Sequence, residues 1–189
     1  MNNKFITYCI TVFAWLAVLY PLWVARGGAI FPLFGITAFT LLWLHALSGA
    51  FEPWLRQHIN FDRFVRITST IILVCILAHP LLLLAMFGFD VFGILETYGA
   101  FYIELGVLGW LLLITYDIGK FFKKHNDFFV THWNKILIIS NIGFLITFFH
   151  SLQLGSDLQT GPLRLMWIFY GITAAAAIFY TYVLKNHPQ

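Results

Sequence analysis

The stretch TIILVCILAHPLLLL, residues 70–84, decides the fold, because it is continuously apolar apart from Thr70 and one ionisable side chain, His79. A run of about 20 apolar residues is long enough to cross the hydrocarbon core of a bilayer as an α-helix. The chain of 189 residues is 60% hydrophobic and only 10% charged, which leaves too few polar residues to coat a soluble domain. We therefore expect an integral membrane protein whose surroundings are the lipid bilayer.

Apolar runs of this length occur six times. They predict an all-α, polytopic membrane protein with six transmembrane helices in a bundle. The expected spans are residues 5–25, 29–51, 67–88, 97–117, 134–154 and 165–184. They fill the chain, so residues 1–189 are predicted to form a single transmembrane domain. The sequence shows no internal repeat, P-loop or GxGxxG turn, so a soluble redox or energy-coupling domain is expected on another chain.

The basic residues predict the orientation of the spans. Two of them, Arg26 and Arg164, fall on one side, and nine fall on the other: Lys4, Arg56, Arg63, Arg66, Lys120, Lys123, Lys124, Lys135 and Lys185. Cytoplasmic loops of membrane proteins are enriched in Lys and Arg, so both termini are expected in the cytoplasm. The net charge of +3 needs no nucleic-acid partner to explain it.

Two histidines within the spans are the main candidate functional residues. An ionisable side chain there is costly and normally faces a bundle interior, a cavity or a cofactor. His79 lies about 20 Å along its helix from Arg66, and His150 lies about 22 Å along its helix from Lys135, so both are expected at one level in the outer half. Two such imidazoles suit the axial positions of a haem b iron. The alternative is a pair of histidines that only form hydrogen bonds within the bundle.

Four further residues complete the predicted site. Gly143 precedes His150 by seven residues on the same helical face and is expected to leave room for a porphyrin edge, with Phe148 as an apolar wall. His45 and His132 lie toward the cytoplasmic side. They are either the ligands of a second haem or, respectively, a hydrogen-bonding partner of a neighbouring helix and an interfacial residue.

Glu104 is expected about 10 Å below the outer edge if its helix begins at Thr97. Three roles are open for it. It orients an axial imidazole, it binds or protonates a quinone, or it is a neutral acid hydrogen-bonded between helices.

The segments FDRFVRITSTIILVCILAHPLLLL (residues 61–84) and HWNKILIISNIGFLITFFHSLQLG (residues 132–155) resemble the ferric reductase-like transmembrane domain family. This is the six-helix haem b module of ferric reductases, NADPH oxidases and the membrane subunit of the methionine sulfoxide reductase system. The resemblance is strongest over residues 40–155, and it implies that His79 and His150 are the outer pair of haem ligands. The inner pair that the family often carries is absent, because this chain has Val65 or Arg66 and Ile136 or Leu137 at those positions.

The resemblance implies electron transfer through one bis-histidine haem b in a bacterial inner membrane. The expected donor is a quinol or a separate flavin reductase, and the expected acceptor is a redox partner on the outer side. The chain would then be the transmembrane electron-transfer subunit of an oxidoreductase, with no catalytic side chain of its own. Two alternatives remain: a haem-free membrane scaffold or assembly protein, and a small proton-coupled transporter that uses Glu104.

Overall fold

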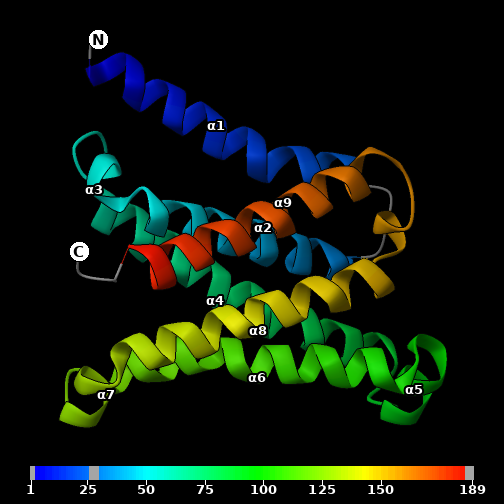
Figure 1. Cartoon of the computed structure of the whole chain (residues 1–189). Coiled ribbons are helices and arrows are strands. Elements are labelled where there is room, and N and C mark those ends of the chain that lie inside the picture. Colours follow the sequence, from blue (N-terminus) through cyan, green and yellow to red (C-terminus); the bar gives the residue numbers. More distant parts are fainter. Residues whose placement is uncertain (1–2, 26–29, 186–189) are drawn as a thin grey trace. The chain divides into compact units, whose positions relative to one another are not determined.

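The computed structural model describes residues 3–25 and 30–185, so Arg26 lies outside the described residues. Every regular element in these ranges is a helix (Figure 1). Within the described ranges, six helical segments are long and apolar enough to cross a membrane. They are Lys4–Val24 in α1 (Asn3–Val24), α2 (Ile30–Ala50), α4 (Phe61–Met86), α6 (Ala100–Phe122), α8 (Trp133–Leu154), and Gly161–Leu184, which joins α9 (Gly161–Phe179) to the π-helix η2 (Tyr180–Leu184). The all-helical fold and the six candidate spans are confirmed.

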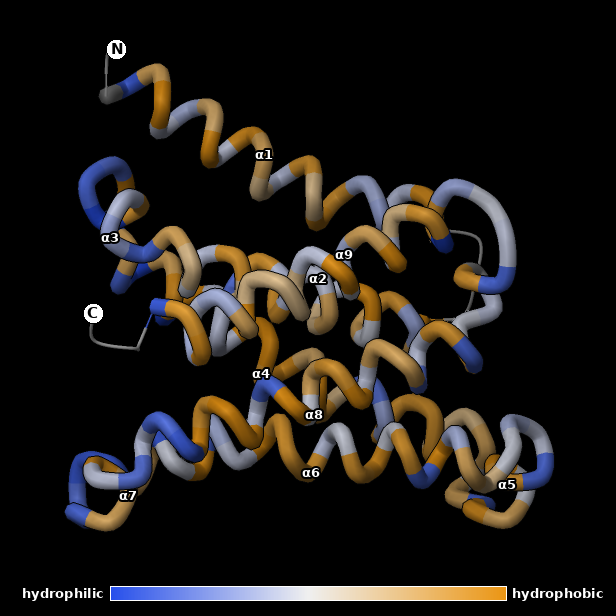
Figure 2. The backbone as a smooth tube through the Cα atoms, viewed as in Figure 1, coloured by the Kyte–Doolittle hydropathy of each residue, from blue (hydrophilic) through white to orange (hydrophobic). Residues whose placement is uncertain are grey.

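Short helices connect the spans. They are α3 (Glu52–Leu55), α5 (Val91–Tyr98), α7 (Asp127–Thr131) and the 3-10 helix η1 (Ser156–Leu158). Figure 2 shows hydrophilic residues gathered at α3, at α7 and in the connecting turns, whereas the long helices are mainly hydrophobic. Large apolar side chains are exposed along the spans, among them Leu111, Ile142 and Leu165. Outward-facing apolar side chains of this kind suit a helix surrounded by lipid.

The fourth span begins and ends later than predicted. Gly99 has a φ of +84°, a left-handed conformation that glycine adopts without steric cost, and it separates α5 from α6. α5 is a separate helix with its own N-terminal cap: the side chain of Asp90 accepts a hydrogen bond from the backbone N–H of Gly93 at 3.0 Å. The span is therefore Ala100–Phe122 rather than 97–117, which moves Asp117 from the last position of the span to its interior and puts Glu104 closer to the start.

The chain divides into two compact units. The first comprises the residues up to Leu82 and from Pro162 onward, and the second comprises Leu83–Gly161. α1, α2, α3, most of α4 and nearly all of α9 belong to the first unit, and α5, α6, α7, α8 and η1 belong to the second. The single domain expected over residues 1–189 stays a prediction.

An aromatic stack between α2 and α9 forms the core of the first unit. Phe39 and Trp43 lie four residues apart on α2, so they share a face. The ring of Phe39 stacks on Trp167 at 4.3 Å, and that of Trp43 stacks on Tyr170 at 3.9 Å. The stack is held in register by polar contacts, since Trp43 Nε1 donates to the Thr173 hydroxyl at 2.8 Å. The Tyr170 hydroxyl also donates to the carbonyl of Ala17 at 3.0 Å, which joins α1 to this core.

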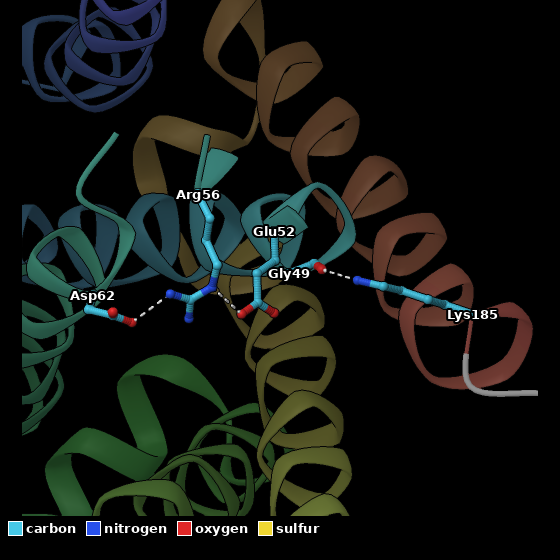
Figure 3. A network of polar contacts seen from close by, with 5 residues as sticks. All are labelled: Gly49, Glu52, Arg56, Asp62 and Lys185. Atoms are coloured by element: carbon cyan, nitrogen blue, oxygen red, sulfur yellow. Dashed lines mark hydrogen bonds and ion pairs between the residues drawn. The ribbon is translucent and has the colours of Figure 1, made fainter. Parts of the chain in front are cut away.

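Charged residues form a network of polar contacts at the end of the first unit that contains α3 and the end of η2 (Figure 3). Arg56 contacts Glu52 through Nε at 2.9 Å and Asp62 through Nη1 at 3.0 Å, so it links α3 to the first turn of α4. These hydrogen bonds with Glu52 and Asp62 raise the pKa of the Arg56 guanidinium. Lys185 donates from Nζ to the carbonyl of Gly49 at 3.3 Å and ties the end of η2 to that of α2. The positive charge of Arg56 is therefore matched by two carboxylates of the same unit.

The second unit is built on an antiparallel pair of long helices. α6 and α8 lie side by side along their lengths, with α7 at the turn between them (Figure 1). The turn is capped by Asn126, whose side chain accepts a hydrogen bond from the backbone N–H of Phe128 at 2.9 Å. The close approach of the helices depends on glycine: a Cβ on Gly109 would lie 3.1 Å from the carbonyl oxygen of Gly143.

Candidate functional site

His79 is held between α4 and α2 in the first unit. Its Nδ1 lies 2.8 Å from the carbonyl oxygen of Phe31, and its half-buried ring lies against Gly35, where an added Cβ would be 3.0 Å from Cε1 and 3.1 Å from Nδ1. A carbonyl oxygen only accepts hydrogen bonds, so Nδ1 carries the proton and donates it. The neutral ring then has its lone pair on Nε2.

His150 is held in the same way between α8 and α6 in the second unit. Its Nδ1 donates to the carbonyl oxygen of Tyr102 at 2.8 Å, and its half-buried ring lies against Gly106. A Cβ on Gly106 would be 2.5 Å from both Nδ1 and Cε1, which is closer than real side chains approach. We call each arrangement, a histidine ring with the carbonyl and the glycine that hold it, a histidine clamp.

The two clamps have the same spacing along the chain. In both, the carbonyl precedes the histidine by 48 residues and the glycine lies four residues after the carbonyl. Each position of the second clamp is 71 residues after its counterpart; the pairs are Phe31 and Tyr102, Gly35 and Gly106, and His79 and His150. The elements correspond as well, since a short helix joins α2 to α4 and another joins α6 to α8. The three residues of one clamp thus recur in the other at a constant offset of 71, a local repeat that was not expected from the sequence.

The repeat was not evident because few residues are identical across it and because the key partner is a backbone atom. Any residue can offer a carbonyl, so Phe31 and Tyr102 carry no signal in their side chains. One feature of the sequence could have revealed the match: each histidine has a glycine 44 residues before it, at Gly35 and Gly106. The two histidines were predicted as site residues from the sequence, whereas the two glycines were not.

Each clamp fixes its histidine in a tautomer that can bind a metal. A histidine that binds a metal usually donates its other ring N–H to a carbonyl, a carboxylate or water, which fixes the tautomer and the direction of the ring. In each clamp a backbone carbonyl is that acceptor, and the glycine lets the ring lie directly on the neighbouring helix. In this tautomer Nε2 is the ring nitrogen that is chemically able to bind a metal.

Gly106→Ala is expected to displace the His150 ring and break its bond to the carbonyl of Tyr102, because the new Cβ would collide with Nδ1. Gly35→Ala is expected to have a smaller effect on His79, since its Cβ would lie 3.0 Å from the nearest ring atom. Nitrogen-15 NMR of ring-labelled histidine in detergent measures which nitrogen is protonated, and His150→Gln assigns the signal. An unchanged His150 signal in Gly106→Ala would contradict the clamp.

Gly143 takes part in helix packing. A Cβ there would lie 2.8 Å from each of three α6 atoms: the oxygen of Gly109, the Cβ of Leu112 and the nitrogen of Leu113. The room beside Gly143 is thus taken by α6, which corrects the expectation that it admits a porphyrin edge. Phe148 is half-buried on α8, with its ring 5.4 Å from that of Phe149, and its role in a pocket stays a prediction.

His45 forms a hydrogen bond with a neighbouring helix of the first unit. Its Nε2 lies 2.5 Å from the hydroxyl of Thr68 on α4. That hydroxyl donates its single proton to the carbonyl of Phe64 at 2.7 Å, so it accepts from His45, and Nε2 is the protonated nitrogen. This is the contact left open as the alternative to a second haem site.

His132 is fixed within its own turn of the second unit. Its Nδ1 donates to the carbonyl of Phe128 at 2.9 Å, and its ring stacks on that of Phe128 at 4.3 Å. Both contacts lie within one helical turn, whereas each clamp joins two long helices. A second haem held by His45 and His132 stays a prediction.

Glu104 is exposed on α6, two residues after Tyr102. The hydrogen bond of His150 Nδ1 is made with the backbone carbonyl of Tyr102 and not with the Glu104 carboxylate. Asp117 is a second acid within the same span and is half-buried. The roles considered for Glu104 with a quinone or a proton stay predictions.

No protein-family model, curated protein or solved structure matches this chain. The resemblance to the ferric reductase-like transmembrane domain therefore stays a prediction, and the two clamps are the observations from which a function can be argued.

Proposed function

We propose that this chain is a membrane b-type cytochrome in which His79 and His150 are the axial ligands of one haem b. The observation that carries the proposal is the pair of clamps, since each holds a histidine by Nδ1 and leaves the lone pair of the neutral ring on Nε2. Both histidines lie in spans whose length and hydropathy suit a bilayer.

The residues present fit a haem b in their chemistry. Neutral imidazole is a common axial ligand, and hydrogen bonding of its Nδ1–H to a carbonyl makes Nε2 a better donor to the metal. Bound haem supplies an iron that alternates between Fe(II) and Fe(III) and carries one electron. The protein would supply both axial nitrogens, fix their tautomers and exclude water with apolar helices. With histidine on both faces of the haem, no substrate is expected at the metal.

The wider setting of the proposal follows from the sequence. The distribution of Lys and Arg supports a topology with both termini in the cytoplasm. The resemblance suggests a bacterial inner membrane, a quinol or a separate flavin reductase as the electron donor, and an acceptor on the outer side. In this setting the chain is the transmembrane electron-transfer subunit of an oxidoreductase.

The test is the visible spectrum of the purified chain. The protein is produced with ample haem supply, extracted in mild detergent, and examined by reduced-minus-oxidised spectra and a pyridine haemochrome assay. About one haem b per chain, with the sharp bands of a low-spin bis-histidine iron, is the expected result. Absence of haem from a well-folded preparation would overturn the proposal and favour a haem-free scaffold. Two haems per chain would reopen the roles of His45 and His132.

A further inference from the structure

The turn between α6 and α8 is basic and aromatic. This basic turn, residues 116–135, carries Lys120, Lys123, Lys124 and Lys135 against Asp117 and Asp127, for a net charge of +2 with histidine neutral. The repeat provides an internal comparison, because residues 45–64 occupy the corresponding place in the first unit. There Arg56 and Arg63 are balanced by Glu52 and Asp62, for a net charge of zero. The two turns thus differ in charge.

The basic turn holds two of its ammonium groups over aromatic rings. Nζ of Lys123 lies 4.2 Å from the centre of the Trp133 ring, and Nζ of Lys120 lies 5.5 Å from that of Tyr116. The two rings are 5.7 Å apart, so both cations belong to one cluster. The Trp133 ring also lies near Gly119, where an added Cβ would be 3.4 Å from it, an ordinary van der Waals distance. Cation–π contacts keep the lysine charge while restricting its position.

In the corresponding turn of the first unit, residues 45–64, the basic side chain Arg56 contacts acidic side chains. Arg56 is engaged by the carboxylates of Glu52 and Asp62, so its positive charge is already matched (Figure 3). An aromatic ring does not neutralise an ammonium group, so Lys123 over the Trp133 ring retains its attraction for an anion. Tyr and Trp are also the residues that favour the headgroup level of a bilayer.

Apolar side chains next to these lysines are exposed. Phe121 is 68% exposed and Phe128 is 58% exposed, and Lys124 lies between them in the chain. An anionic protein surface would offer such rings a polar environment, whereas a phospholipid offers a phosphate to the lysines and acyl chains to the rings. The combination therefore favours lipid as the occupant.

We propose that the basic turn binds the headgroup of an anionic phospholipid. Lys120, Lys123 and Lys124 contact the phosphate, and Phe121 and Phe128 lie among the acyl chains. The proposal is independent of haem binding, since it rests on a different set of residues.

Native mass spectrometry of the full chain in mild detergent tests the proposal. The chain is titrated with dioleoylphosphatidylglycerol and, separately, with dioleoylphosphatidylcholine, and the ratio of the two affinities is compared among variants. The variant is Lys120→Gln/Lys123→Gln/Lys124→Gln. The matched control, Lys4→Gln/Arg63→Gln/Arg66→Gln, removes the same number of positive charges from the first unit. Circular dichroism and size-exclusion chromatography establish that both are folded.

The native chain is expected to prefer phosphatidylglycerol, and the triple lysine variant is expected to lower that preference at least about tenfold. The control is expected to keep most of it, and Lys→Arg at the same three positions is expected to preserve it. An equal fall in variant and control would show general charge attraction and overturn the site. An unchanged preference in the lysine variant would also overturn it, and would leave an acidic protein surface as the partner. If the triple variant is misfolded, Lys123→Gln alone is the deciding measurement.

Discussion

His79→Ala and His150→Ala are each expected to lower the haem b content of the purified chain by at least about tenfold. Each substitution removes an imidazole whose Nδ1 is held by a backbone carbonyl and whose Nε2 is the proposed ligand atom. Alanine offers no replacement donor. The measurement is the pyridine haemochrome assay on detergent-purified protein, expressed as haem per chain.

Two controls separate loss of a ligand from loss of the fold. His132→Ala removes a ring that bonds within its own helical turn, so its haem content is expected to stay near that of the native chain. Added imidazole is expected to restore part of the haem binding in the two alanine variants, because it can enter the space left by the missing ring. A misfolded chain would not respond to it.

Two other patterns of haem content among the variants would contradict the assignment of the ligands. If His150→Ala keeps its haem while His79→Ala loses it, the ligand opposite His79 has been assigned wrongly. If both variants keep their haem and His45→Ala loses it, the site lies elsewhere in the first unit. Neither outcome is compatible with the two clamps as the ligand set.

The number of spans could be predicted because span length and hydropathy are local properties. All six apolar runs became long helices, and their ends moved by only a few residues in most cases. The start of α6 could not be predicted in this way. The left-handed backbone of Gly99 ends α5 one residue before α6 begins, and an apolar count cannot detect that break.

Only the histidines of the candidate site could be predicted from the sequence, and their partners could not. His79 and His150 stand out because ionisable groups are rare in apolar runs. Their partners, Phe31 and Tyr102, lie 48 residues away and contribute backbone carbonyls, so no side-chain pattern reveals them. Gly143 illustrates the opposite error: a small residue near a histidine was interpreted as room for a cofactor, although another helix fills the space.

Gly143→Ala is expected to destabilise the second unit by about 1–3 kcal/mol, the usual cost of overpacking a closely packed site. The new Cβ would meet the oxygen of Gly109, the Cβ of Leu112 and the nitrogen of Leu113, each at 2.8 Å. Two of these are backbone atoms, which cannot rotate away as a side chain can. α6 and α8 must therefore separate. Loss of helicity during titration with a denaturing detergent measures the change in stability.

Gly49→Ala is the matched control for this substitution. Gly49 also lies within a long helix, α2, but an added Cβ there meets nothing within 4 Å. Alanine favours the helix over glycine by up to about 1 kcal/mol, so this variant is expected to be as stable as the native chain or more stable. Equal destabilisation of both variants would show that the loss of glycine flexibility matters more than the contact between α6 and α8.

The same two helices carry the second clamp, so the consequences of Gly143→Ala should extend beyond stability. Gly143 precedes His150 by two turns of α8, and the carbonyl that holds the ring belongs to α6. When α6 and α8 separate, the bond from His150 Nδ1 to Tyr102 lengthens and the ring loses its fixed direction. Haem content is therefore expected to fall in Gly143→Ala and to remain normal in Gly49→Ala. A destabilised variant with unchanged haem content would show that the helices near His150 stay together while those near Gly143 part.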